Sequence, residues 1–139
     1  MSDPTLSSPL FAHVLIQQFA SAFLAILFLQ SGMDKVLDWK GNLAYQVQYF
    51  SKTPLALGVP GMLGLLTVLE LAAGGLSAAG VIAVLAHRGT TLAFLGAALS
   101  TGTFLCLFLG QRIAKDYSAA AGMAPYFLVG LAAMFLTAG

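Results

Sequence analysis

One carboxyl group in this chain lies where a carboxyl group is costly. Of the six basic and five acidic residues, Glu70 stands in the middle of a long apolar stretch, and the others fall at the ends of such stretches. A charged group at bilayer depth is disfavoured on insertion scales, so it needs a partner, a proton or a function. Glu70 is therefore the position where intramembrane chemistry would be visible in the sequence.

The neighbours expected around Glu70 allow three roles. In an up-and-down helical bundle, Glu70 would lie near mid-membrane, level with the hydroxyl groups of Ser100, Thr101 and Thr103 and with no Lys or Arg at that depth. It can hydrogen-bond those hydroxyls and clamp the helices, or it can relay a proton or contact a quinone together with them and with Lys35. Alternatively, it can form an ion pair with Lys35, whose long side chain extends from its helix end.

Composition places the chain in a membrane. It has 139 residues, of which 59% are hydrophobic and 8% charged, whereas a soluble domain has about 25% charged residues. The net charge of +1 gives no basic footprint for nucleic acid. The single cysteine, Cys106, excludes an internal disulfide, and no metal-ligand cluster or nucleotide-binding glycine loop is found. The expected surroundings are a lipid bilayer, with no metal, nucleotide or nucleic acid bound.

The charge-free intervals predict four membrane-spanning helices. A helix needs about 20 apolar residues to cross the hydrocarbon core, and each interval holds one such helix. The fold class is therefore an all-α, integral membrane, up-and-down four-helix bundle, forming a single transmembrane domain over residues 1–139. The predicted spans are 10–32, 61–86, 91–111 and 121–138. The first span is expected to be a retained helix, because it does not have the pattern of a secretory signal.

The segment 33–60 is the longest predicted connection and is rich in aromatic residues. Apolar residues recur in it at helical spacing, with lysines and glutamines between them. One interpretation is a short amphipathic helix at the membrane interface, with Trp39, Tyr45 and Tyr49 at headgroup depth. The other is a packed linker that carries interfacial aromatic residues. Both remain open from the sequence.

The distribution of basic residues predicts the orientation. Lysines and arginines concentrate in the first and third connections, which places both in the cytoplasm and both termini on the opposite, periplasmic side. Small residues on the second span, including Gly74, Gly75, Ala78 and Ala79, predict close helix packing, because lipid offers no hydrophobic drive between helices.

Three segments together resemble the DoxX family of small bacterial membrane proteins. They are Phe28–Lys35 with its glycine and lysine, Val68–Gly75 with its glutamate and glycines, and Gly110–Tyr117 followed by Pro125 and Tyr126. The resemblance implies a four-helix protein of the bacterial cytoplasmic membrane. It also implies that Gly32, Lys35, Glu70, Gly74 and Gly75 are signature positions, with Gly32 in helix packing, and it suggests a link to quinone-coupled redox systems.

Three functions follow as expectations. The first is a non-catalytic accessory or scaffold subunit of a larger respiratory, redox or cell-envelope complex, with other membrane subunits as partners and no catalytic activity of its own. The alternative is a quinone-interacting or proton-handling subunit of an oxidoreductase, with quinone as the only cofactor considered. The third is a small oligomeric transporter, which is disfavoured because the helices lack the central breaks that transporters use to bind substrates.

Overall fold

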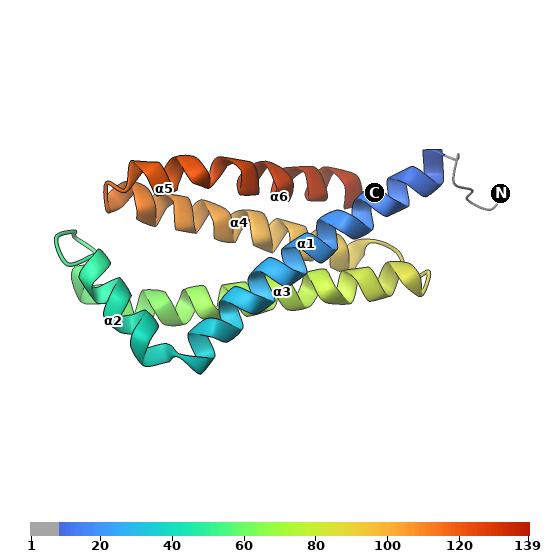
Figure 1. The fold of residues 1–139 in the computed structure, drawn as a ribbon. Helices are drawn as coiled ribbons and strands as arrows, with labels where there is room; N and C mark the ends of the chain where they lie inside the picture. The colour runs from blue at the N-terminus through green and yellow to red at the C-terminus, as the bar shows by residue number, and fades with distance from the viewer. Residues whose placement is uncertain (1–8) are drawn as a thin grey trace.

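The computed structural model describes residues 9–139, and most of them are helical. The long elements are α1 (Pro9–Leu37), α3 (Val59–Leu85), α4 (Thr91–Ile113) and the consecutive pair α5 (Tyr117–Gly122) and α6 (Ala124–Thr137). They run up and down side by side, with α1 crossing the others obliquely (Figure 1). Four segments are long and apolar enough to cross a membrane. The predicted helical membrane bundle is confirmed at this level.

Two predicted boundaries were wrong. The first helix does not end at residue 32 but continues to Leu37. The next residue, Asp38, is the N-cap of the following helix. The fourth span is two helices rather than one, because the chain turns at Met123 and α6 begins with a proline in its first turn. Proline at a helix start is favoured because its missing N–H would have no intrahelical partner there.

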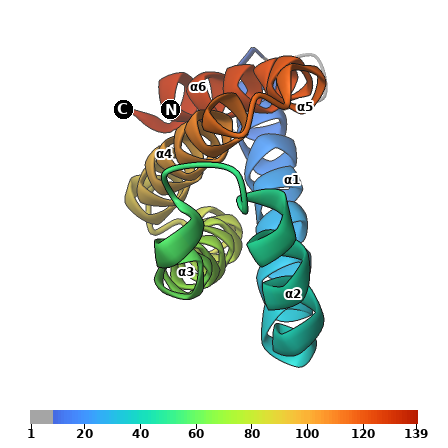
Figure 2. The same cartoon turned by 90° about the vertical axis from the view of Figure 1, so that its left-hand side faces the viewer.

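The connection between α1 and α3 contains the predicted short helix. This helix, α2 (Trp39–Tyr49), buries none of its residues fully and is capped by the Asp38 carboxylate, which accepts a hydrogen bond from Gly41 N at 3.2 Å. A short 3₁₀ turn, η1 (Ala56–Gly58), then leads into α3. In the end-on view, α2 lies in front of the lower part of α1, and the following loop crosses towards α3 (Figure 2).

Helix α3 packs mainly against α1 and α4, and its glycines set how closely the helices approach. A Cβ added to Gly74 would meet the backbone nitrogen of Leu29 at 2.7 Å, so α1 and α3 are nearly in backbone contact there. Gly75 was expected to pack as well, but it is exposed and a Cβ there would meet nothing within 4 Å. Its expected packing role within the bundle was wrong, because it faces away from both neighbours. Ala78 and Ala79 are partly buried.

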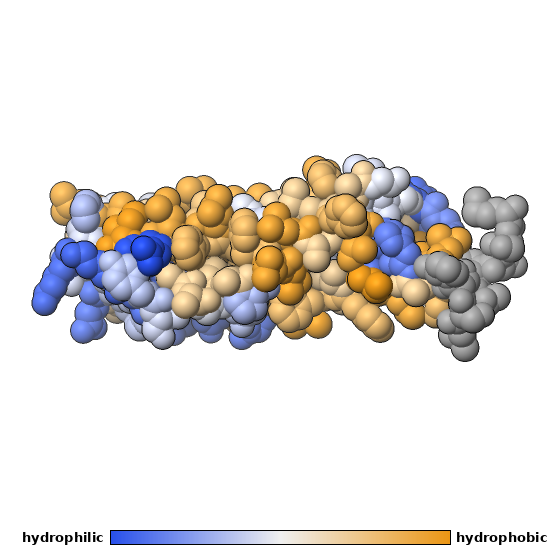
Figure 3. Space-filling model, turned by 90° about the horizontal axis from the view of Figure 1, so that it is seen from above, coloured by the Kyte–Doolittle hydropathy of each residue, from blue (hydrophilic) through white to orange (hydrophobic). Residues whose placement is uncertain are grey.

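The core is a small apolar cluster, and the outer surface is apolar too. The buried cluster consists of Leu24, Phe28, Ala73, Ala97, Phe104 and Ala133. Outside it, large apolar side chains such as Phe19, Ile26 and Phe135 are at least two-thirds exposed. The space-filling view shows apolar residues covering the middle of the elongated molecule, while hydrophilic residues gather towards its two ends (Figure 3). This distribution suits a lipid bilayer around the middle of the bundle.

Two glutamines of α1 attach it to other helices. Gln17 Nε2 donates to the carbonyl of Leu136 in α6 at 2.7 Å, and Gln18 Nε2 donates to the carbonyl of Val81 in α3 at 3.2 Å. Such interhelical hydrogen bonds are typical stabilising contacts in membranes. Both adjacent glutamines are thus used within the chain.

Candidate functional site

Glu70 forms an ion pair inside the bundle. Its Oε1 lies 2.8 Å from Lys35 Nζ, and Lys35 also donates to Ser31 Oγ at 3.0 Å. The residue Glu70 is only 2% exposed. The carboxylate–ammonium contact has the distance of an ion pair but not the angles of a hydrogen bond. Of the three roles that the sequence left open, the structure therefore contains the ion pair with Lys35.

The ion pair forms because α1 is longer than predicted and crosses the other helices obliquely (Figure 1). Lys35 lies in the last turn of α1, beyond the predicted end of the helix. One turn earlier, Gly32 lets α1 approach α3 so closely that an added Cβ would meet the Leu71 side chain at 2.7 Å. The expectation that no basic group reaches the level of Glu70 was wrong, since this close approach brings the flexible lysine stem alongside α3.

The predicted hydroxyl neighbours of Glu70 are engaged elsewhere. Thr101 Oγ1 donates to the carbonyl of Ala97, and Thr103 Oγ1 donates to the carbonyl of Leu99, each at 2.7 Å within α4. Ser100 is fully buried, and its Oγ has no hydrogen-bond partner among residues 9–139. No hydrogen bond between Glu70 and these three hydroxyls is present in the described part of the chain. Of the five residues predicted for proton or quinone contact, Lys35 and Glu70 thus form an ion pair, and Thr101 and Thr103 form bonds within their own helix. Ser100 has no side-chain partner among the described residues.

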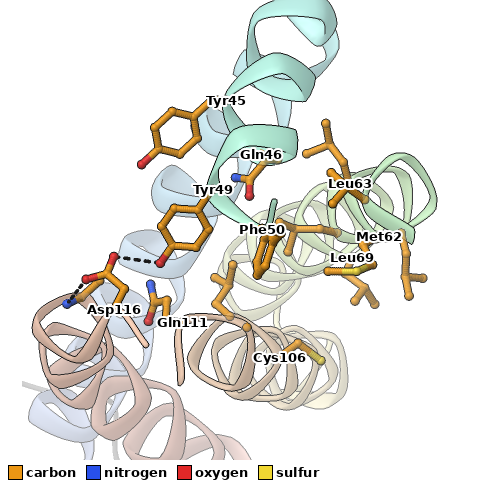
Figure 4. A pocket seen from close by; sticks show the side chains of 16 residues that line it. Tyr45, Gln46, Tyr49, Phe50, Met62, Leu63, Leu69, Cys106, Gln111 and Asp116 are labelled. Atoms are coloured by element: carbon orange, nitrogen blue, oxygen red, sulfur yellow. Dashed lines mark hydrogen bonds between the residues drawn. The ribbon is translucent and has the colours of Figure 1, made fainter. Parts of the chain in front are cut away.

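A pocket lies at a different place, at the end of the bundle that carries α2. Its volume is about 340 Å³, within the range of small-molecule sites, about 300–1,000 Å³. It lies between α2, α3, the end of α4 and the start of α5. The close-up shows Tyr49, Gln111 and Asp116 on one side of it and Met62, Leu69 and Cys106 on the other (Figure 4). Neither Lys35 nor Glu70 lines it.

The turn after α4 places Asp116 at this pocket. Lys115 adopts a left-handed conformation with φ 59°, and the next amide, Asp116 N, donates to the carbonyl of Gln111 at 2.9 Å. Together with the bond from Lys115 N to the carbonyl of Arg112, this is a Schellman ending of α4. Asp116 then caps α5 through Ala119 N. Its carboxylate is fixed between two helices, facing the pocket.

Tyr49 of α2 connects to Asp116 across the pocket. Its hydroxyl donates to Asp116 Oδ2 at 2.8 Å, which joins the interfacial helix to the α4–α5 turn. Burial, the hydrogen bond to Asp116 and the negative charges nearby raise the pKa of Tyr49 to about 12. The phenol is thereby held in its neutral, hydrogen-bond-donating form.

The raised pKa of Tyr49 gives a titration that can be measured. We expect tyrosinate absorbance of Tyr49, taken as the difference between wild type and Tyr49→Phe, to appear near pH 12 rather than 10. The Asp116→Asn variant should lower the midpoint but leave it above 10, because burial remains. Since the folded pKa is above the unfolded one, the Tyr49 contribution to stability is complete below about pH 10 and declines towards about pH 12. A wild-type midpoint near 10 would contradict the hydrogen bond.

The three predicted interfacial aromatic residues lie in different environments, and Tyr49 lines the pocket. Trp39 leans on α3, where a Cβ on Gly64 would lie 3.8 Å from the Trp39 ring. Tyr45 is 63% exposed and stacks on Tyr49, with ring centroids 5.9 Å apart. Sequence reasoning singled out the tyrosines but missed Asp116 and Gln111 as their neighbours. The only local signal was the capping aspartate before Tyr117, and that signal does not indicate which helix the carboxylate meets.

Potential metal ligands and similarity to known proteins do not assign a function to this chain. Among residues 9–139, no group of three or more His, Cys, Asp or Glu side chains is placed to hold a metal ion. Cys106 is exposed at the pocket. No protein-family model, curated protein or solved structure matches this chain. Function must therefore be argued from the geometry.

Proposed function

We propose that this chain is a DoxX-like integral membrane protein that serves as a non-catalytic subunit of a larger membrane complex, of the respiratory, redox or cell-envelope type. The main support for this proposal is the ion pair that Glu70 forms inside the bundle. The one acid at bilayer depth is bound to Lys35 at 2.8 Å and buried between α1 and α3, so it contributes to holding the helices together. Gln17 and Gln18 are likewise bound to neighbouring helices.

The outer surface supports a partner in the membrane. Gly75 on α3 and Gly102 on α4 are exposed, and a Cβ at either position would meet nothing within 4 Å. The bundle itself does not use these glycines, and neither gives lipid a large side chain to contact. Small residues at such positions let the backbone of another membrane helix approach closely. A bundle that binds Glu70, Gln17 and Gln18 to its own helices, and whose outer surface lets another helix approach closely, suits a scaffold role in the bacterial cytoplasmic membrane.

The alternative of a quinone-interacting or proton-handling subunit finds less support at its predicted residues. Lys35 and Glu70 are paired with each other, and Thr101 and Thr103 bond to carbonyls of their own helix. A proton relay through Glu70 would first have to break the ion pair.

Blue-native electrophoresis of native membranes in mild detergent tests the proposal. We expect the chain to migrate in a band much larger than 14.4 kDa, with other membrane proteins identified by mass spectrometry. Gly75→Leu should reduce this band, because a large side chain blocks close helix approach. Gly122→Leu is the matched control, since Gly122 is also exposed with open space around it.

Two results would overturn the proposal. Migration of the chain alone, as one or a few copies, would contradict membership of a larger complex and favour a self-contained protein. If Glu70→Gln left the complex intact but abolished proton-coupled turnover of the co-migrating enzyme, Glu70 would have a chemical role and the alternative would hold.

A further inference from the structure

The pocket under α2 is divided into a polar side and an apolar side. Its charged and amide groups, Gln46, Gln111 and Asp116, are outnumbered by apolar side chains from α3 and α4. In the close-up, Gln111, Asp116 and Tyr49 lie together, and Met62, Leu69 and Cys106 lie at the opposite side (Figure 4). A pocket divided in this way fits a molecule with one polar end and one apolar end.

The polar side contains an acceptor with no partner. Gln111 Oε1 is buried and makes no hydrogen bond within the described residues. A buried polar atom without a partner costs about 1–3 kcal/mol, so such atoms usually meet a bound molecule or water. The neighbouring Asp116 carboxylate already accepts from Tyr49 and Ala119. A polar group bound in the pocket can therefore form a hydrogen bond with the side-chain amide of Gln111.

The charge at the pocket disfavours an anionic head group. Asp116 is the only charged residue in the lining, and it is acidic. The nearest arginine in sequence, Arg112, lies outside the lining and stacks on the Tyr117 ring, 4.5 Å from its centroid. A phosphate or carboxylate head would meet a negative charge without a cation to balance it, which is unfavourable in a low-dielectric site.

The apolar side leads to the lipid-facing surface. Leu65 is 62% exposed, and Cys106 is exposed as well, although both line the pocket. Cys106 lies about 10 Å along α4 from the end of that helix, at a rise of about 1.5 Å per residue. A tail could therefore extend from the polar end of the bundle towards the hydrocarbon core, as lipid chains do.

We propose that this pocket binds a neutral, single-tailed amphiphile whose hydroxyl group forms a hydrogen bond with the side-chain amide of Gln111. The head lies beside Tyr49 and Asp116, and the tail leaves past Leu65 and Cys106. A lipid-soluble phenol and a long-chain alcohol share this chemistry. The proposal does not depend on membership of a larger complex.

Photocrosslinking in membrane vesicles that contain the full chain tests the site. The probe is an alkylphenol with a diazirine in its alkyl chain, and mass spectrometry maps where it inserts. We expect insertion near Cys106 and Leu69, suppressed by excess octylphenol about five-fold more than by octylbenzene, which lacks the hydroxyl. Dodecanol as a further competitor distinguishes the sources: competition equal to octylphenol indicates that any alcohol is accepted, and weaker competition indicates a phenol ring.

A matched pair of variants assigns the hydrogen bond. Gln111→Leu should remove the advantage of octylphenol over octylbenzene, whereas Gln48→Leu, on the exposed face of α2 and outside the pocket, should keep it. Equal competition by octylphenol and octylbenzene in wild type would overturn the proposal, because it would mean simple partitioning into lipid. Stronger competition by phosphatidylglycerol than by either hydroxyl compound would overturn the neutral head group.

Discussion

Replacing Lys35 with methionine is expected to lower the free energy of unfolding by about 3–5 kcal/mol, the cost of breaking a buried ion pair from one side. Methionine keeps most of the length of the side chain but leaves the Glu70 carboxyl without its cation. Glu70 is 2% exposed, so water cannot replace the lysine. The measurement is an unfolding titration in mixed micelles, followed by helix content.

The opposite single variant should cost less. Glu70→Gln leaves Lys35 near the end of α1, where Ser31 still accepts from its ammonium and the side chain can turn towards the interface. Removing both charges, as in Lys35→Met with Glu70→Leu, should bring stability back close to wild type, since paired buried charges are often replaceable by apolar groups.

The losses of unfolding free energy in the two single variants and in the double variant together give the coupling energy of Lys35 and Glu70. A loss below about 1 kcal/mol for Lys35→Met would contradict a buried pair, because that value is typical of exposed ion pairs.

The ion pair also shows where sequence reasoning stops. Charge-free intervals predict helices well, because lipid requires a continuous apolar segment and internally satisfied backbone groups. The meeting of Lys35 and Glu70 depends instead on how α1 crosses α3. That crossing is set by the close contact of Gly32 with Leu71, which no helix-length pattern contains.

The pocket was unpredictable for the same reason. Tyr49 and Asp116 come from α2 and from the turn after α4, far apart in sequence, and they meet only when these two segments come together at one end of the bundle. An interfacial helix was one of two interpretations of the spacing of apolar and aromatic residues, but the spacing does not say against which helix it packs. Helix caps and the length of apolar segments can be recognised in short windows of sequence, whereas the neighbours of a side chain depend on tertiary packing.

A close backbone contact between α3 and α4 leads us to expect a loss of about 2 kcal/mol of unfolding free energy in Gly80→Ala. A Cβ at Gly80 would meet Ala93 Cα at 2.5 Å and Ala93 N at 2.6 Å. These are backbone atoms of α4, so relief requires the whole α3–α4 hairpin to open. The loss should exceed the gain of up to about 1 kcal/mol that alanine brings to a helix over glycine.

Gly75→Ala is the matched control, because it makes the same change on the same helix. A Cβ at Gly75 would meet nothing within 4 Å, so only the helix-propensity gain should remain, and the isolated chain should be unchanged or slightly more stable. Both variants are measured by the same mixed-micelle unfolding. Equal stability of the two would mean that α3 and α4 are further apart than the contact at Ala93 requires. A lower stability for Gly80→Ala alone would confirm the close contact between Gly80 and Ala93.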